Sequence, residues 1–255
     1  MRRVFVAVFL LSAVVALTSS AIRLRAQDAS TAVERGHFRL YKFEQNIGEE
    51  TYEISRDASS ITANINFKFT DRSTDVPLTV SFRAAPDLSP LSFSIKGKTS
   101  RGSEIDDAVE IQSGKARIRK REQNTELGVR DRFFTVAGYA PSAMQMLMVR
   151  YWAAHGSPAQ LETLPENGAV TITERGVDQI AVNGKPERLT RYSVEGLIWG
   201  RETLWFDSAR KLVAAVSTDA EFDHFEALRD GFVKALLGGC GDLRDARNGH
   251  GVPPS

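Results

Sequence analysis

Four histidines and one cysteine are the side chains in this sequence best suited to hold a metal ion. A catalytic zinc site needs three converging protein ligands, which commonly include histidines at close spacing. The sequence has no HxH, HExxH or HxxEH motif, and His37, His155, His224 and His250 stand far apart. We therefore expect no metal site and no cofactor.

The surroundings of His224 suggest a second kind of chemistry. Glu221, Asp223 and Glu226 surround this imidazole, a pattern that suits a general base or a metal ligand. The same acids are also favoured at the exposed start of a helix by the helix dipole. No G-x-S-x-G nucleophile motif and no phosphate-binding glycine loop is present. We predict no catalytic residue.

Methionine and tryptophan side chains gather in two stretches that could line an apolar groove. Three of the four methionines lie between 144 and 148, and methionine adapts well to irregular apolar partners. The residues that we expect to bind a ligand are Met144, Met148 and Trp152 on one wall, Trp199 and Trp205 on the other, and Arg201 or Glu202 at the rim. The ordinary alternative is that these residues fill a core, as any helix packed on a sheet requires.

The elements that must position these residues are mostly strands. Between 61 and 70 every second residue is apolar, the period of a strand with one solvated face. Asn183-Gly184 predicts a tight hairpin, because both central residues of such a turn favour positive φ. The same alternation predicts strands near 37–46, 50–55, 61–70, 77–84, 91–98, 106–112, 115–121, 132–137, 169–174, 177–183, 187–195, 201–207 and 211–218.

Two helices interrupt the strands. The first begins at Pro141, which is tolerated in a first helical turn, and ends before Gly156. The second begins with the capping-box pair Thr218 and Glu221. Their apolar stripes are Met144, Leu147, Met148, Tyr151 and Trp152 in the first, and Phe225, Leu228, Phe232 and Leu236 in the second. Short links join antiparallel neighbours, so residues 36–237 predict a mainly-β fold: a large curved antiparallel sheet, or half-barrel, with both helices on its concave face.

The two ends of the chain differ from this domain. Arg2 and Arg3 precede an apolar run over 4–17 and then small residues, the pattern of a secretory signal over 1–26 that is cleaved after Ala21 or Ala26. The alternative, an uncleaved anchor, is disfavoured because the run is shorter than the roughly 20 residues that span a bilayer. We expect a periplasmic or secreted protein with a linker over 27–35 and a disordered, glycine-rich tail over 238–255.

The charge balance excludes one class of partner. The chain has 33 basic and 32 acidic residues, a formal net charge of +1, and no long basic run. A nucleic-acid-binding domain normally shows a clustered positive surface. We therefore expect no nucleic-acid partner.

Several longer stretches resemble a known family. These are residues 36–52, 136–141, 148–152, 195–207 and 219–227. They are similar to the N-terminal β-rich region of exported bacterial metal-dependent amidohydrolases, and the resemblance covers about 36–234. In that family a hydrolase barrel with an HxH metal site follows this region. No such motif is present here, so no metal-binding or catalytic residue carries over. The architecture is more distantly similar to the periplasmic lipoprotein carriers.

These observations predict an exported, non-catalytic accessory or binding module. Its ligand would be an apolar small molecule or a lipid, and an amidohydrolase domain supplied separately would be a partner. The alternative is the enzyme class: a truncated fragment of a metal-dependent amidohydrolase, with a tail that comes from another reading frame.

Overall fold

The computed structural model describes residues 32–71, 73–129, 132–137, 139–166, 168–198, 200–218 and 225–238. The chain divides into Met1–Ser30 and Thr31–Ser255, and the fold described below belongs to the second unit. The predicted signal segment and the predicted tail, apart from Gly238, lie outside the described residues.

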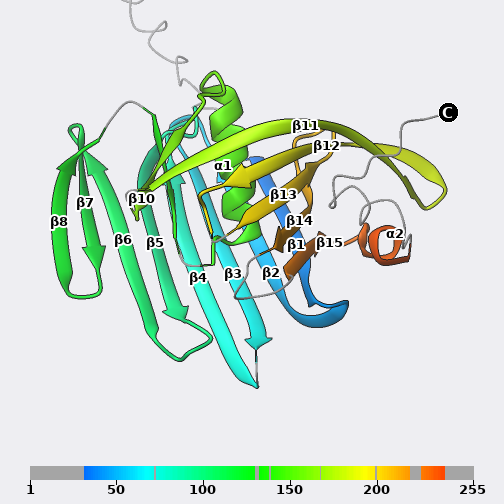
Figure 1. Ribbon diagram of the computed structural model, residues 1–255. Helices are drawn as coiled ribbons and strands as arrows, with labels where there is room; N and C mark the ends of the chain where they lie inside the picture. The colour runs from blue at the N-terminus through cyan, green and yellow to red at the C-terminus, as the bar shows by residue number, and fades with distance from the viewer. Residues whose placement is uncertain are drawn as a thin grey trace, which may run out of the picture. The chain divides into compact units, whose positions relative to one another are not determined.

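A single sheet of fifteen strands forms the body of this unit (Figure 1). Its order is β8-β7-β6-β5-β4-β3-β2-β1-β15-β14-β13-β12-β11-β10-β9. The strands are β1 (Ala32–Lys42), β2 (Gln45–Arg56), β3 (Ile61–Asp71), β4 (Thr74–Ala84), β5 (Pro90–Lys98), β6 (Glu104–Gln112), β7 (Lys115–Lys120), β8 (Gln123–Gly128), β9 (Phe133–Val136), β10 (Leu161–Pro165), β11 (Gly168–Val182), β12 (Lys185–Glu195), β13 (Arg201–Phe206), β14 (Leu212–Thr218) and β15 (Phe225–Arg229).

Nearly all strand pairs are antiparallel, as the short links require. The exception is β9 with β10, which run parallel and are joined by the crossover helix α1 (Ser142–Ala154). The hairpin predicted at Asn183-Gly184 is present: Val182 pairs with Lys185, and the two turn residues have φ of 51° and 76°. The predicted mainly-β fold with a large curved antiparallel sheet is confirmed.

Alternation along the strands places the main core on the inner face of the curve. The apolar residues predicted between 61 and 70 are all buried in β3, and β4 presents Val76, Leu78, Val80 and Phe82 to the same core. Side chains of alternate residues point to opposite faces of a sheet. One face of these strands is therefore apolar and the other is solvated.

The sheet curls so far that its last strands approach its middle. β9 contacts β5, and β10 contacts β6. Phe134 of β9 packs against Phe82 of β4 with ring centroids 5.4 Å apart. Lys120 of β7 forms a 2.7 Å ion pair with Glu166, directly after β10. Because β8 and β9 remain the two ends of the strand order in the described chain, the sheet is an open half-barrel.

Helix α1 lies inside this curve and is buried on most sides (Figure 1). Pro141 is its N-cap residue, so the predicted start is confirmed. A single apolar face was expected, yet Ser142 and Gln145 are also buried. The physical reason is that strands from both arms of the half-barrel surround the helix.

The second predicted helix is largely wrong. Residues 225–229 form β15, paired with β1 on one side and β14 on the other, and the helix α2 covers only Val233–Gly238. Residues 219–224 lie outside the described chain. A strand buries these apolar residues as well as a helix would. Phe225 and Ala227 face the main core, and Leu228 faces a second cluster on the other side of the sheet.

Helix α2 lies on the opposite face of the sheet from α1, so the expectation that both helices cover the concave face is wrong. Its Val233 and Leu236 pack on a second apolar cluster that includes Tyr41, Leu189 and Trp205. In β13, Leu204 and Phe206 belong to the main core and Trp205 between them belongs to this second cluster. Alternation along the strand therefore puts the two helices on different faces.

Other boundaries also differ from the predicted ones. β1 starts at Ala32, inside the predicted linker 27–35. β8 and β10 were not predicted, and β11 is one strand with a bulge between Glu174 and Gly176 where two strands were expected. Short strands and strands interrupted by a bulge contain too few alternating residues to be recognised from sequence periodicity.

Candidate functional site

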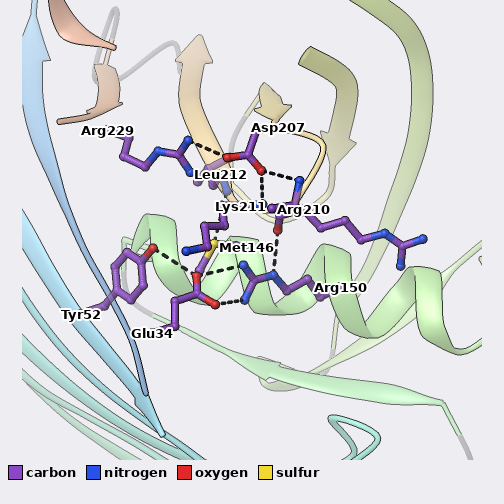
Figure 2. A network of polar contacts seen from close by, with 10 residues as sticks. Glu34, Tyr52, Met146, Arg150, Asp207, Arg210, Lys211, Leu212 and Arg229 are labelled. Atoms are coloured by element: carbon purple, nitrogen blue, oxygen red, sulfur yellow. Dashed lines mark hydrogen bonds and ion pairs between the residues drawn. The ribbon is translucent and has the colours of Figure 1, made fainter. Parts of the chain in front are cut away.

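A network of charged side chains joins α1 to strands and a turn of the sheet (Figure 2). Glu34 comes from β1, Arg150 from α1, Arg229 from β15, and Asp207 and Arg210 from the turn between β13 and β14. These residues are distant in sequence and meet only because the sheet curls around α1.

The ion pair between Arg150 and Glu34 is the centre of the network. Arg150 donates from Nη1 and Nη2 to the two carboxylate oxygens of Glu34, at 3.1 and 3.0 Å. Their side chains are only 16% and 23% exposed, so this bidentate pair is shielded better than an ordinary surface pair. The Tyr52 hydroxyl also donates to Glu34. Burial and the Glu34 charge both raise the pKa of Tyr52.

The turn at 207–211 is stabilised by hydrogen bonds within itself, to Arg229 and to Arg150. Asp207 Oδ1 accepts the backbone N–H groups of Ala209 and Lys211, both at 2.9 Å. Its other oxygen accepts from Arg229 Nη2 at 2.6 Å. Arg150 Nε donates to the carbonyl oxygen of Arg210 at 2.8 Å. The turn therefore has a defined position relative to α1.

Helix α1 also contributes a sulfur acceptor to this region. The backbone N–H of Leu212, the first residue of β14, donates to Met146 Sδ at 3.3 Å. This contact and the Arg150 hydrogen bond join two successive turns of α1 to the same loop (Figure 2).

A cavity of about 230 Å³ lies beside this network, and we call it the α1 hollow. The apolar part of its lining includes Val149, Ala153, Phe206 and the ring of Tyr192. The polar part comes from Arg150, Glu174, Asp207 and Arg210. The hollow is therefore amphipathic.

Two further hollows lie elsewhere on the unit. One of about 180 Å³ lies on the other side of Arg150, with mostly apolar walls that include Ile54, Ile61 and Leu147. The other, of about 620 Å³, is an open groove between α2, the 183–184 turn and Arg39. The α1 hollow differs from both because it combines an aromatic wall with the charges of the network.

Glu50 holds the N-terminal end of α1 in place. Its two carboxylate oxygens accept the backbone N–H groups of Ser142 and Ala143, each at 2.7 Å. These are orphan donors of the first helical turn, which Pro141 does not cap through a side chain. The Glu50 side chain is fully buried, and this burial raises its pKa to about 7 although the hydrogen bonds oppose the shift.

Comparison with known proteins bears on the fold alone. The chain is similar to a solved structure described as the beta-barrel-like protein of domain of unknown function DUF1849 from Brucella abortus. The TM-score is 0.52 at 12% identity, over 76% of this chain and 94% of that one. No protein-family model matches the chain, and no curated protein matches it. The resemblance to exported amidohydrolases stays a prediction that these comparisons do not test.

The structure does not bring the predicted ligand-binding residues together. Met144 and Met148 are 0% exposed and Trp152 is 8% exposed, all within the main core. Trp205 lies on the opposite face of the sheet, where its Nε1–H donates to Asp178 at 2.7 Å. Trp199 lies outside the described residues. The expectation that Trp205 forms the wall facing Met144 is therefore wrong.

The two predicted rim residues also separate. Glu202 is buried on the inner face and accepts a hydrogen bond from Gln145 Nε2 at 2.8 Å. Arg201, the preceding residue, is exposed and pairs with Glu195 at 2.9 Å. Neighbouring residues of a strand point to opposite faces, so the two cannot serve the same rim.

Sequence reasoning missed the residues that do converge, above all Glu34, Arg150, Asp207 and Arg210. One signal was present: Arg150 is the only charged residue in the helix Ser142–Ala154. A lone arginine in an otherwise apolar helix indicates a specific partner, because burying an unpaired charge is costly. The identity of that partner depended on the fold.

Two features are absent from the described residues. Within them, no three His, Cys, Asp or Glu side chains are grouped in a way that could hold a metal ion. No helix in the described part of the chain has the length and apolar character needed to cross a membrane.

Proposed function

We propose that this protein is an exported, non-catalytic binding module whose binding site is the α1 hollow. The observation that carries the proposal is the amphipathic cavity itself, whose lining combines apolar side chains of α1 and β13 with charged side chains. Ligand sites combine apolar walls with a few well-placed polar groups. The rim residues Ser208 and Arg210 are exposed, so a ligand would enter from solvent.

The methionines of α1 do not line this hollow. Met144, Met146 and Met148 are fully buried among core side chains, which supports their role as core filling. The volume of about 230 Å³ is below the roughly 300–1,000 Å³ that is usual for sites of drug-sized ligands. A compact ligand therefore fits the hollow better than a long acyl chain does.

Filling the hollow tests its role. Ala153 lines the cavity and is half-buried, whereas Ala154 beside it is exposed. We expect Ala153→Leu to abolish the binding of small aromatic probes such as benzoate and benzamide, because the added methyl groups occupy their space. Ala154→Leu should bind them as the wild type does. Ligand-observed NMR measures binding, and thermal unfolding confirms that both variants are folded. Equal binding by the two variants would place the site elsewhere.

The proposed export makes a separate prediction. The residues Arg2, Arg3 and the apolar run after them support a cleaved signal. We expect the mature chain to start at Ile22 or Gln27 and to be recovered from the periplasm or the medium. N-terminal sequencing of the exported protein measures this. Recovery of the chain with Met1 in a membrane pellet would contradict it.

A further inference from the structure

We propose that the ligand of the α1 hollow is a compact organic anion, with its carboxylate held by Arg210 and its apolar body against Phe206 and Val149. This inference rests on the proposed function and specifies the class of ligand. It depends on which charged side chains at the hollow already form hydrogen bonds or ion pairs within the protein.

Both acidic side chains of the hollow are engaged by the protein itself. Asp207 accepts hydrogen bonds from two backbone N–H groups of its own turn and from Arg229. Glu174 shares a hydrogen bond with the Tyr192 hydroxyl. Asp207 is therefore engaged by three donors, whereas the exposed carboxylate of Glu174 accepts one hydrogen bond and keeps further acceptor capacity.

The two arginines of the hollow differ in this respect. Arg150 is held by Glu34 and by the Arg210 carbonyl oxygen. The Arg210 guanidinium has no acceptor among the residues that the structure describes, and its side chain is exposed. Figure 2 shows this side chain extending away from Asp207 and from the guanidinium of Arg150. Arg210 is therefore the cation at the hollow that is open to an anionic ligand.

Arg210 lines the hollow together with Tyr192. Burial raises the pKa of Tyr192 and the Glu174 charge adds to this effect, whereas the Arg210 charge acts in the opposite direction. A planar guanidinium at this position presents paired N–H donors that match a carboxylate.

The other wall suits a flat apolar group. Tyr192 and Phe206 pack edge to face with ring centroids 5.6 Å apart. The ring of Trp152 packs edge to face on Tyr192, with centroids 6.0 Å apart. Aromatic rings favour offset or edge-on packing with one another. An aromatic or branched carboxylate of about the size of benzoate fits within the available 230 Å³.

The test compares three probes on the full exported chain. Benzoate and benzamide have nearly the same shape and differ in charge, and hexadecanoate carries the same carboxylate on a long chain. We expect benzoate to bind about tenfold more tightly than benzamide, since hydrogen bonds to charged groups are the stronger ones. Hexadecanoate should bind no better than benzoate. Titration calorimetry at low salt measures all three.

Two arginine variants separate a specific contact from general charge. Arg210→Gln should remove the preference for benzoate over benzamide. Arg188→Gln is the matched control, because Arg188 is exposed on β12 and does not line the hollow. It should keep the preference. The same loss in both variants would overturn the assignment to Arg210.

The outcomes distinguish this inference from the proposed function. Equal binding of benzoate and benzamide, blocked by Ala153→Leu, would overturn the anion inference and leave the binding module standing. Stronger binding of hexadecanoate would overturn the compact ligand. Failure of every probe to bind the wild type would overturn both the inference and the proposed function.

Discussion

Replacing Trp152 by alanine is expected to lower the free energy of unfolding by about 3–5 kcal/mol, the usual cost of truncating a large buried aromatic residue. Trp152 is 8% exposed, packs edge to face on Tyr192, and donates from Nε1 to the Pro158 carbonyl oxygen at 2.9 Å. The variant would lose these contacts and leave a cavity between α1 and β12. Chemical denaturation of the purified protein measures the change.

Val177→Ala is the control for this prediction. Val177 is apolar but 46% exposed on β11, and surface substitutions usually change stability by no more than about 0.5 kcal/mol. The comparison also separates the two interpretations of the methionine and tryptophan cluster. A groove residue would lose ligand affinity with little loss of stability. A Trp152→Ala variant as stable as the control would therefore contradict the core assignment.

Replacing Glu50 by glutamine is expected to change how stability depends on pH. Burial raises the pKa of Glu50 from 4.5 to about 7. Between these two pH values the unfolded chain has lost the proton and the folded chain still holds it. The free energy of unfolding therefore falls as pH rises through this window, by up to about 3 kcal/mol from this group. Glutamine does not titrate, so the variant should lack this component.

The measurement is the difference between the variant and the wild type at each pH. Relative to the wild type, Glu50→Gln should become more stable by about 3 kcal/mol between about pH 4.5 and about pH 8. Glu53→Gln on the same strand is the control, because Glu53 forms an exposed ion pair with Arg35. An exposed ion pair contributes at most about 1 kcal/mol, so the difference for Glu53→Gln should vary much less than that for Glu50→Gln. A constant difference for Glu50→Gln would show that its carboxyl titrates normally.

The candidate site was less predictable than the strands. Arg150 was visible as a lone charge in an apolar helix, but its partner Glu34 is 116 residues away in sequence. Glu50 looked like any acid in a solvated strand, and only the docking of α1 on β2 removes it from water. Period and spacing describe which residues share a face of one element. They carry no information about which distant element covers that face.

The sequence by itself determined the elements with a strong local signal. The alternation over 61–70, the Asn183-Gly184 turn and the helix that follows Pro141 all appear in the structure, because side-chain period and backbone φ preferences act within a few residues. Only the tertiary structure decided that residues 225–229 form a strand, that Trp205 faces away from Trp152, and that Arg210 borders a hollow. The physical reason is that backbone pairing with β1 and β14 and burial against distant strands outweigh local propensity, and both depend on how the sheet curls.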